Sequence, residues 1–79
     1  MIIETHLSDS AVEKIRFLIS HLPIKEADII KKLYGIEEEE QTLKQVAEQY
    51  HVSRDRIIQI RNRAIRRMRS RAARYYDTP

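Results

Sequence analysis

Cysteine is absent from this sequence of 79 residues, and turn-forming residues are scarce, with one glycine and two prolines. Without cysteine the chain can form no disulfide and can offer no thiolate as a nucleophile or zinc ligand. A chain of this length makes one small domain, over residues 1–79, with little room for a buried catalytic cleft. The few glycines and prolines leave few turns, so regular elements should dominate.

Long apolar runs and a signal peptide are also missing. The longest uninterrupted apolar runs are two or three residues, far short of the roughly 20 that span a membrane. The first ten residues, MIIETHLSDS, have neither the basic start nor the long apolar stretch of a signal peptide. We therefore expect a soluble cytoplasmic protein with no membrane partner.

The sequence also lacks the residue patterns of an enzyme. His6, His21 and His51 are widely separated, without the close spacing that metal sites use. There is no nucleophile signature around a serine and no glycine-rich phosphate loop. We expect no catalysis, no cofactor and no bound metal.

What the chain does have is a sharp change of charge. Residues 1–52 carry six basic and ten acidic side chains, whereas residues 53–79 carry nine arginines against two aspartates. A basic stretch this dense is typical of a surface that faces nucleic acid, an acidic protein or an anionic membrane. A solvated helix tail is the alternative. The exclusive use of arginine favours bidentate contacts with phosphates or bases.

Apolar spacing is helical throughout, which predicts an all-α domain of four helices, over residues 10–20, 24–34, 43–50 and 54–74. Ser10 and Glu13 have the spacing of a capping box at the first helix. Gly35 is suited to end the second helix in a left-handed conformation, with Ile36 folded back. Thr42 and Ser53 are good caps for the third and fourth helices.

Each helix shows one apolar face. The face of the first helix consists of Ile15, Leu18, Ile19 and Leu22. The face of the second helix consists of Ala27, Ile29, Ile30, Leu33 and Tyr34. The last helix has a narrow apolar stripe of Ile57, Ile60, Ala64, Met68 and Ala72. Its opposite side carries Asp55, Gln59, Asn62, Arg63 and Arg66, so this side should face solvent or a ligand.

The third and fourth helices have the residue pattern of a helix-turn-helix. Ala47 is small enough for close helix packing, Val52 can fill the turn, and Ile57 and Ile60 can anchor the second helix, with Val46 and Tyr50 completing the set. His51 replaces the glycine common in such turns, and histidine tolerates positive φ better than most residues. The C-terminal half of the chain therefore predicts a DNA-binding helix-turn-helix.

Four stretches resemble region 4 of bacterial sigma factors of the primary-sigma class. They are LPIKEA (22–27), LYGI (33–36), TLKQVAEQYHVSRDRIIQI (42–60) and AIRRMR (64–69), and the resemblance covers about residues 8–71. It implies a last helix in the major groove of a promoter −35 element and upstream helices that hold the flap tip of the RNA polymerase β subunit. It places Arg54, Asp55 and Gln59 at base edges, and Lys25, Thr42, Ser53 and Arg56 near the DNA backbone.

The side chains themselves suit these roles. Arg54 can bond a guanine as a fork, Asp55 can accept from cytosine N4, and Gln59 can pair with adenine. Lys25 and later arginines such as Arg63 can bind phosphates in a salt-dependent manner. Alternatives are that Asp55 only complements the helix dipole and that Arg54 is a solvated first-turn residue.

The chain departs from the family pattern in three ways. Ile58 stands where arginine is usual; it either adds packing or contacts a thymine methyl and so changes the preferred site. Leu33 replaces a common basic residue. The other sigma regions are absent, so the chain alone should not open a promoter, and a second protein could supply them.

Several functions remain open at this point. The chain could be a small bacterial or phage-encoded, nucleoid-associated regulator, half of a split sigma factor, or an autonomous repressor whose dimer surface is the first helix or residues 72–76. A different class is a protein-interaction module, a sigma mimic or inhibitor that occupies the polymerase or another acidic partner. Tyr75 and Tyr76 are expected to be a loose end.

Overall fold

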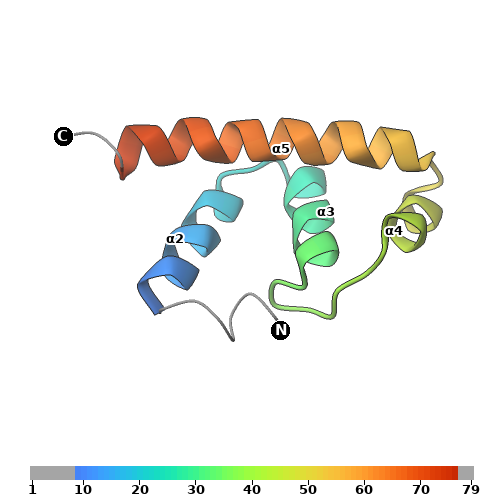
Figure 1. The fold of residues 1–79 in the computed structure, drawn as a ribbon, viewed down its shortest axis with the longest axis horizontal. Coiled ribbons are helices and arrows are strands. Elements are labelled where there is room, and N and C mark those ends of the chain that lie inside the picture. Colours follow the sequence, from blue (N-terminus) through green and yellow to red (C-terminus); the bar gives the residue numbers. More distant parts are fainter. Residues whose placement is uncertain (1–8, 77–79) are drawn as a thin grey trace.

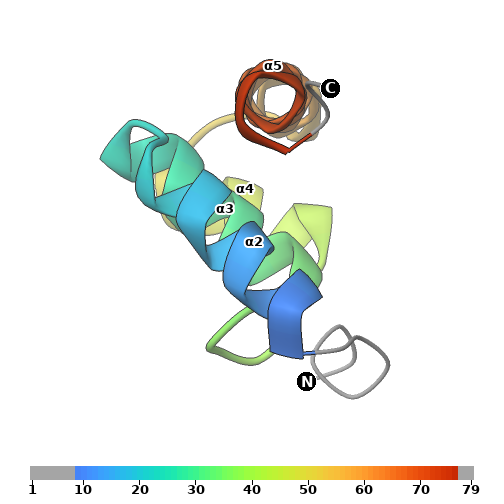
Figure 2. The same cartoon turned by 90° about the vertical axis from the view of Figure 1, so that its left-hand side faces the viewer.

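The computed structural model describes residues 9–76, which form four α-helices and no strand. The helices are α2 (Asp9–Ser20), α3 (Ile24–Tyr34), α4 (Leu43–Tyr50) and α5 (Arg54–Tyr75). α5 is a long rod, and the three shorter helices lie on one side of it (Figure 1). Viewed nearly along its axis, α5 forms one layer and α2, α3 and α4 the other (Figure 2). The expected all-α, four-helix architecture is confirmed.

Local signals explain where most helices begin and end. Gly35 adopts the left-handed conformation at φ 64°, and the N–H groups of Gly35 and Ile36 both donate to the Lys31 carbonyl. Ile36 is buried, so it does fold back onto α3 as expected. The capping box predicted for Ser10 and Glu13 is wrong. Ser10 is itself helical, because α2 already begins at Asp9, and a residue with helical backbone cannot serve as the N-cap.

The core consists of two clusters that meet at α3. The first joins α2, α3 and the middle of α5 through Ile19, Leu22, Ile30, Ile36 and Ala64. The second lies under the helix-turn-helix and contains Ile29, Val46, Ala47, Ile57 and Ile60. Ile29 and Ile30, which are adjacent in α3, thus enter different clusters, and α5 packs on both clusters.

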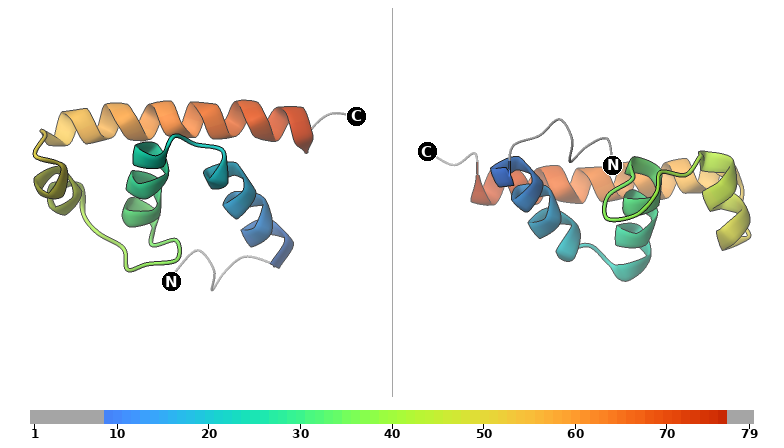
Figure 3. Two further views of the ribbon diagram at one scale, coloured as in Figure 1. Left: turned by 180° about the vertical axis from the view of Figure 1, so that it is seen from behind. Right: turned by 90° about the horizontal axis from the view of Figure 1, so that it is seen from below.

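One apolar residue of α3 is not buried as its pattern suggested. Tyr34 was expected on the buried face but is exposed. α3 runs away from α5, so its last turn extends beyond the helix that covers its start (Figure 3). Ile24, the first residue of α3, is 89% exposed. No helix within residues 9–76 combines the length and the apolar character needed to cross a membrane.

The end of α5 packs against α2, contrary to the expected loose end. The rings of Tyr75 and Tyr76 lie edge-on to Phe17, at centroid distances of 5.5 and 6.1 Å. Lys14 Nζ lies 5.0 Å from the centroid of the Tyr76 ring. Aromatic and cation–π contacts of this kind hold the two helices together where the apolar stripe of α5 becomes only half-buried.

Candidate nucleic-acid interface

The turn between α4 and α5 has the geometry of a helix-turn-helix. His51 ends α4 in the left-handed conformation, at φ 55°, and its N–H donates to the Ala47 and Glu48 carbonyls. The Val52 N–H donates to the Ala47 carbonyl at 3.1 Å, and the Val52 side chain packs against the second core cluster. The structure confirms that His51 takes the left-handed conformation and that Val52 fills the turn, as expected.

Both helices of the motif start at well-formed caps. Ser53 Oγ accepts from the Arg56 N–H at 3.1 Å. Thr42 Oγ1 accepts from the Gln45 N–H at 3.1 Å, and Gln45 Oε1 accepts from the Thr42 N–H at 2.8 Å. The hydroxyls of Thr42 and Ser53 are therefore fixed as acceptors, but each keeps its proton free for donation. The Thr42–Gln45 spacing is a capping box that the sequence interpretation missed, although its signature was readable.

The side chains expected to read bases lie on the open side of α5. Arg54, Asp55 and Gln59 are all exposed, and Ile58 is half-buried beside them. These positions span the first two turns of α5, where a recognition helix meets base edges. Arg56 Nη1 donates to Gln59 Oε1 at 3.3 Å, which ties a side chain expected near the backbone to one expected at a base. We call Arg54, Asp55, Ile58 and Gln59 the reading head.

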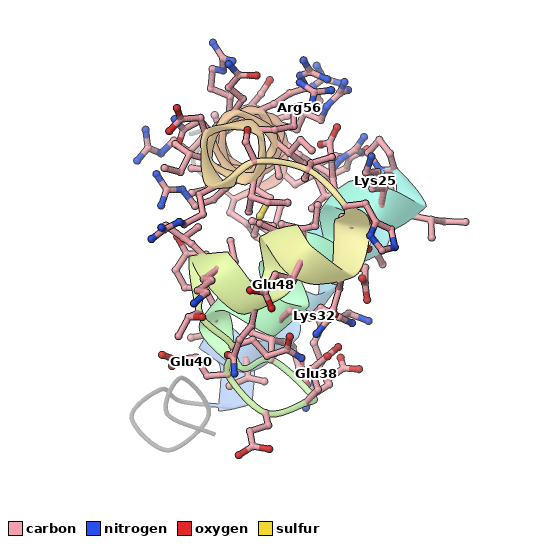
Figure 4. All side chains as sticks on the ribbon, turned by 90° about the vertical axis from the view of Figure 1, so that its right-hand side faces the viewer. Lys25, Lys32, Glu38, Glu40, Glu48 and Arg56 are labelled. Atoms are coloured by element: carbon pink, nitrogen blue, oxygen red, sulfur yellow. The ribbon has the colours of Figure 1, made fainter. Side chains whose placement is uncertain are left out.

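A second basic element comes from α3. Lys25, in its first turn, places Nζ 5.5 Å from the centroid of the Tyr50 ring at the end of α4. Lys25 and Arg56 lie toward the α5 side of the molecule, at the top of Figure 4, while Glu38 and Glu40 lie on the opposite side. Arg63 is also exposed, but it lies about 10 Å further along α5 than Arg56. The structure thus brings Lys25 near the helix-turn-helix and leaves Arg63 farther from the turn.

A polar network fixes α4 against α3. Tyr50 Oη donates to Asp28 Oδ2, and Lys32 Nζ lies 2.8 Å from Asp28 Oδ1 and 3.3 Å from Glu38 Oε1. Burial, together with the hydrogen bond to Asp28, raises the pKa of Tyr50 to about 12. Burial alone would raise the pKa of Asp28, but the hydrogen bonds from Lys32 and Tyr50 bring this pKa below its ordinary value. The contact between Tyr50 of α4 and Asp28 of α3 is not visible in the sequence, because the two residues are 22 positions apart on different helices.

The helix-turn-helix geometry agrees with a family assignment. The family model of sigma-70, region 4, matches residues 18–70. The chain belongs to the sigma-70 region 4 family. Sigma region 4 is a helix-turn-helix domain that binds DNA and has a regulatory rather than an enzymatic role. The matched span contains α3, α4 and the first 17 residues of α5, so it includes the whole reading head.

Proposed function

We propose that this region 4 domain binds duplex DNA at a promoter −35-like element through α5, and the β flap of RNA polymerase through α2 and α3. The proposal rests chiefly on the exposure of Arg54, Asp55 and Gln59 in the first two turns of α5. A helix needed only for packing or for positive charge has no need of a guanidinium, a carboxylate and an amide side by side in its first two turns. Together they match the hydrogen-bonding edges of guanine, cytosine and adenine.

Phosphate contacts supply the second part of the proposal. Arg56 contacts Gln59 of the reading head, and Lys25 lies beside Tyr50 at the end of α4. The exposed Thr42 and Ser53 offer hydroxyls and helix N-termini to an anion. Arg63 extends the basic side of α5. Contacts of this kind set the register of the protein on the duplex and give affinity that falls as salt rises, without reading sequence.

The polymerase contact is assigned to a groove between α2 and α3. This groove of about 580 Å³ is lined by apolar Ile19, Leu22, Ile24 and Ala27 and by a charged rim. The rim includes Arg16 and Lys31, which lie 3.4 and 3.7 Å from Glu37 carboxylate oxygens. An apolar floor with a polar rim is the usual anatomy of a protein interface. The 89% exposure of Ile24 supports an apolar partner such as the flap tip.

Two assays on the same set of variants test the proposal. Duplexes with a −35-like site or a scrambled site are titrated at several salt concentrations, and core RNA polymerase is captured on the tagged protein. We expect a linear fall of log affinity with log salt on both duplexes and tighter binding to the −35-like site. Ile24→Glu should abolish polymerase capture and leave DNA binding intact. Polymerase capture without any sequence preference on DNA would favour the interaction-module function instead.

A further inference from the structure

The C-terminal half of α5 and the end of α2 enclose a second basic feature, distinct from the reading head. It is a groove of about 390 Å³ lined by Arg63, Arg66, Arg67, Arg71 and Arg74. Leu18, in the last turn of α2, also lines it, as do His21 and Leu22 just after α2 and Ser70 of α5. We call this feature the arginine groove. Arg71 lies 17 residues after Arg54, which places it about 25 Å along α5 from the start of the reading head.

The charge within the groove is strongly unbalanced. Among the described residues that line it, five are arginines and none is acidic. Glu26 lies beside it: its buried Oε1 is 3.2 Å from Arg67 Nε and accepts no hydrogen bond within the described part of the chain. Like charges gathered in one hollow repel each other, and a bound anion would relieve that repulsion.

Part of the groove wall, His21 and Arg71, is held in place by packing against neighbouring rings. The His21 ring packs at a tilt against Phe17, at a centroid distance of 4.4 Å, and His21 Nδ1 lies 2.9 Å from the Phe17 carbonyl oxygen. Arg71 lies over the Tyr75 ring at 5.9 Å, and that ring packs on Phe17 in turn. A site whose side chains are positioned in advance loses less entropy when a ligand binds.

We infer that the arginine groove is a phosphate-binding site separate from the reading head. Five guanidinium groups around one small volume favour a ligand with several negative charges, and a phosphate group brings up to two charges where an acidic residue brings one. Guanidinium groups match phosphate oxygens as bidentate donors, and Ser70 adds a hydroxyl. The phosphates can come from a free polyphosphate ligand or from the DNA backbone beyond the bases that α5 reads.

Calorimetric titration of the full chain with inorganic tripolyphosphate tests the site directly. Arg66→Ala and Arg71→Ala should each weaken binding about tenfold, which is the scale of one charge-assisted contact. Arg69→Ala is the matched control, because it removes the same charge from the same stretch of α5 without lining the groove. We expect it to change affinity less than about twofold, as for a screened surface charge. Equal losses for all three variants would overturn the proposal, and thermal melting confirms that each variant is folded.

Two further arms identify the source and the class of the ligand. If the phosphates belong to DNA, the groove variants will lose affinity for a duplex extended on both sides of the −35-like site but not for a short duplex. If they belong to a free ligand, duplex length will make no difference while tripolyphosphate binding is still lost. No tripolyphosphate binding together with no effect of duplex length, or tighter binding of a hexaglutamate peptide at the same arginines, contradicts a phosphate site. Arg54→Ala should leave tripolyphosphate binding unchanged, so failure of the reading head and failure of the groove are separately visible.

Discussion

The hydrogen bond from Tyr50 to Asp28 offers the sharpest test of how the helix-turn-helix is held to α3. Tyr50→Phe removes one hydroxyl and keeps the ring that packs on the core and under Lys25. A hydrogen bond to a charged acceptor contributes about 1.5–3 kcal/mol when buried. The Asp28 side chain is 35% exposed and stays paired with Lys32, so we expect a loss of about 1–1.5 kcal/mol. In a domain of this size that corresponds to a melting temperature lower by roughly 4–12 °C.

The same bond predicts how this loss depends on pH. Folded Tyr50 keeps its proton up to about pH 12, whereas the ordinary pKa of tyrosine is 10.0. The contribution of Tyr50 is therefore complete below pH 10 and is lost as the pH rises through 12. The pKa of Asp28 is lowered from 3.8, so its contribution is complete above that value and is lost as the pH falls through the lowered pKa. The difference between the wild type and Tyr50→Phe should be constant from about pH 5 to 9 and shrink at both ends.

Urea unfolding followed by circular dichroism measures this difference across the pH range. Asp28→Asn and the double variant complete a mutant cycle, which isolates the coupling between the two side chains. We expect a coupling of about 1 kcal/mol at pH 7 that falls toward zero at alkaline pH. A coupling below about 0.3 kcal/mol, or one that does not change with pH, would refute the reasoning, because additive behaviour is expected of side chains that do not interact.

Three further predictions concern the turn and the reading head. Arg54→Ala should weaken binding to the −35-like site by about 1–3 kcal/mol and relax the preference at one base pair. Competition between single-substituted duplexes measures both effects. An equal loss on every duplex would mean that Arg54 only neutralises phosphate. Ile58→Arg should change the consensus selected from a random DNA pool. The half-buried Ile58 lies beside the other reading-head residues, and arginine binds guanine where isoleucine can contact a thymine methyl. An unchanged consensus would remove Ile58 from the reading head. His51→Gly should raise the free energy of unfolding by about 1 kcal/mol, because the left-handed conformation at φ 55° is strained for a residue with a Cβ atom and unstrained for glycine. A lower free energy of unfolding would show that the histidine side chain stabilises the turn.

Features that depend on neighbours in the sequence were predictable here. Gly35, Thr42 and Ser53 stop or start their helices through contacts within four or five residues, and the bounds of α3 and α4 were predicted correctly. The start of α2 was misplaced by one residue, since Asp9, Ser10 and Glu13 are all compatible with a first turn. The exposure of Asp55 and Gln59 also followed from spacing, because α5 has one narrow apolar stripe and the residues opposite it face outward.

Features that depend on how helices cross were not predictable. Tyr34 has the right spacing for the buried face of α3, yet it is exposed at the last residue of the helix, although the adjacent Leu33 still packs on the second core cluster. Tyr50 and Asp28 are 22 residues apart and meet only because α4 packs on α3. The arginine groove requires the end of α2 to lie beside the second half of α5. Periodicity gives the direction that a side chain takes from its own helix, but it does not say which other helix stands there.

These contacts give α3 a role that its unremarkable sequence does not suggest. Ile29 enters the cluster under the helix-turn-helix, while the adjacent Ile30 enters the cluster with α2. Asp28 holds α4 through Tyr50, and Glu26 pairs with Arg67 beside the arginine groove. One helix therefore sets the position of both halves of α5. Any ligand that draws Arg67 away from Glu26 must leave a buried carboxylate without its partner, and such a carboxylate is costly. The reading head and the arginine groove are thus separate surfaces that share one support.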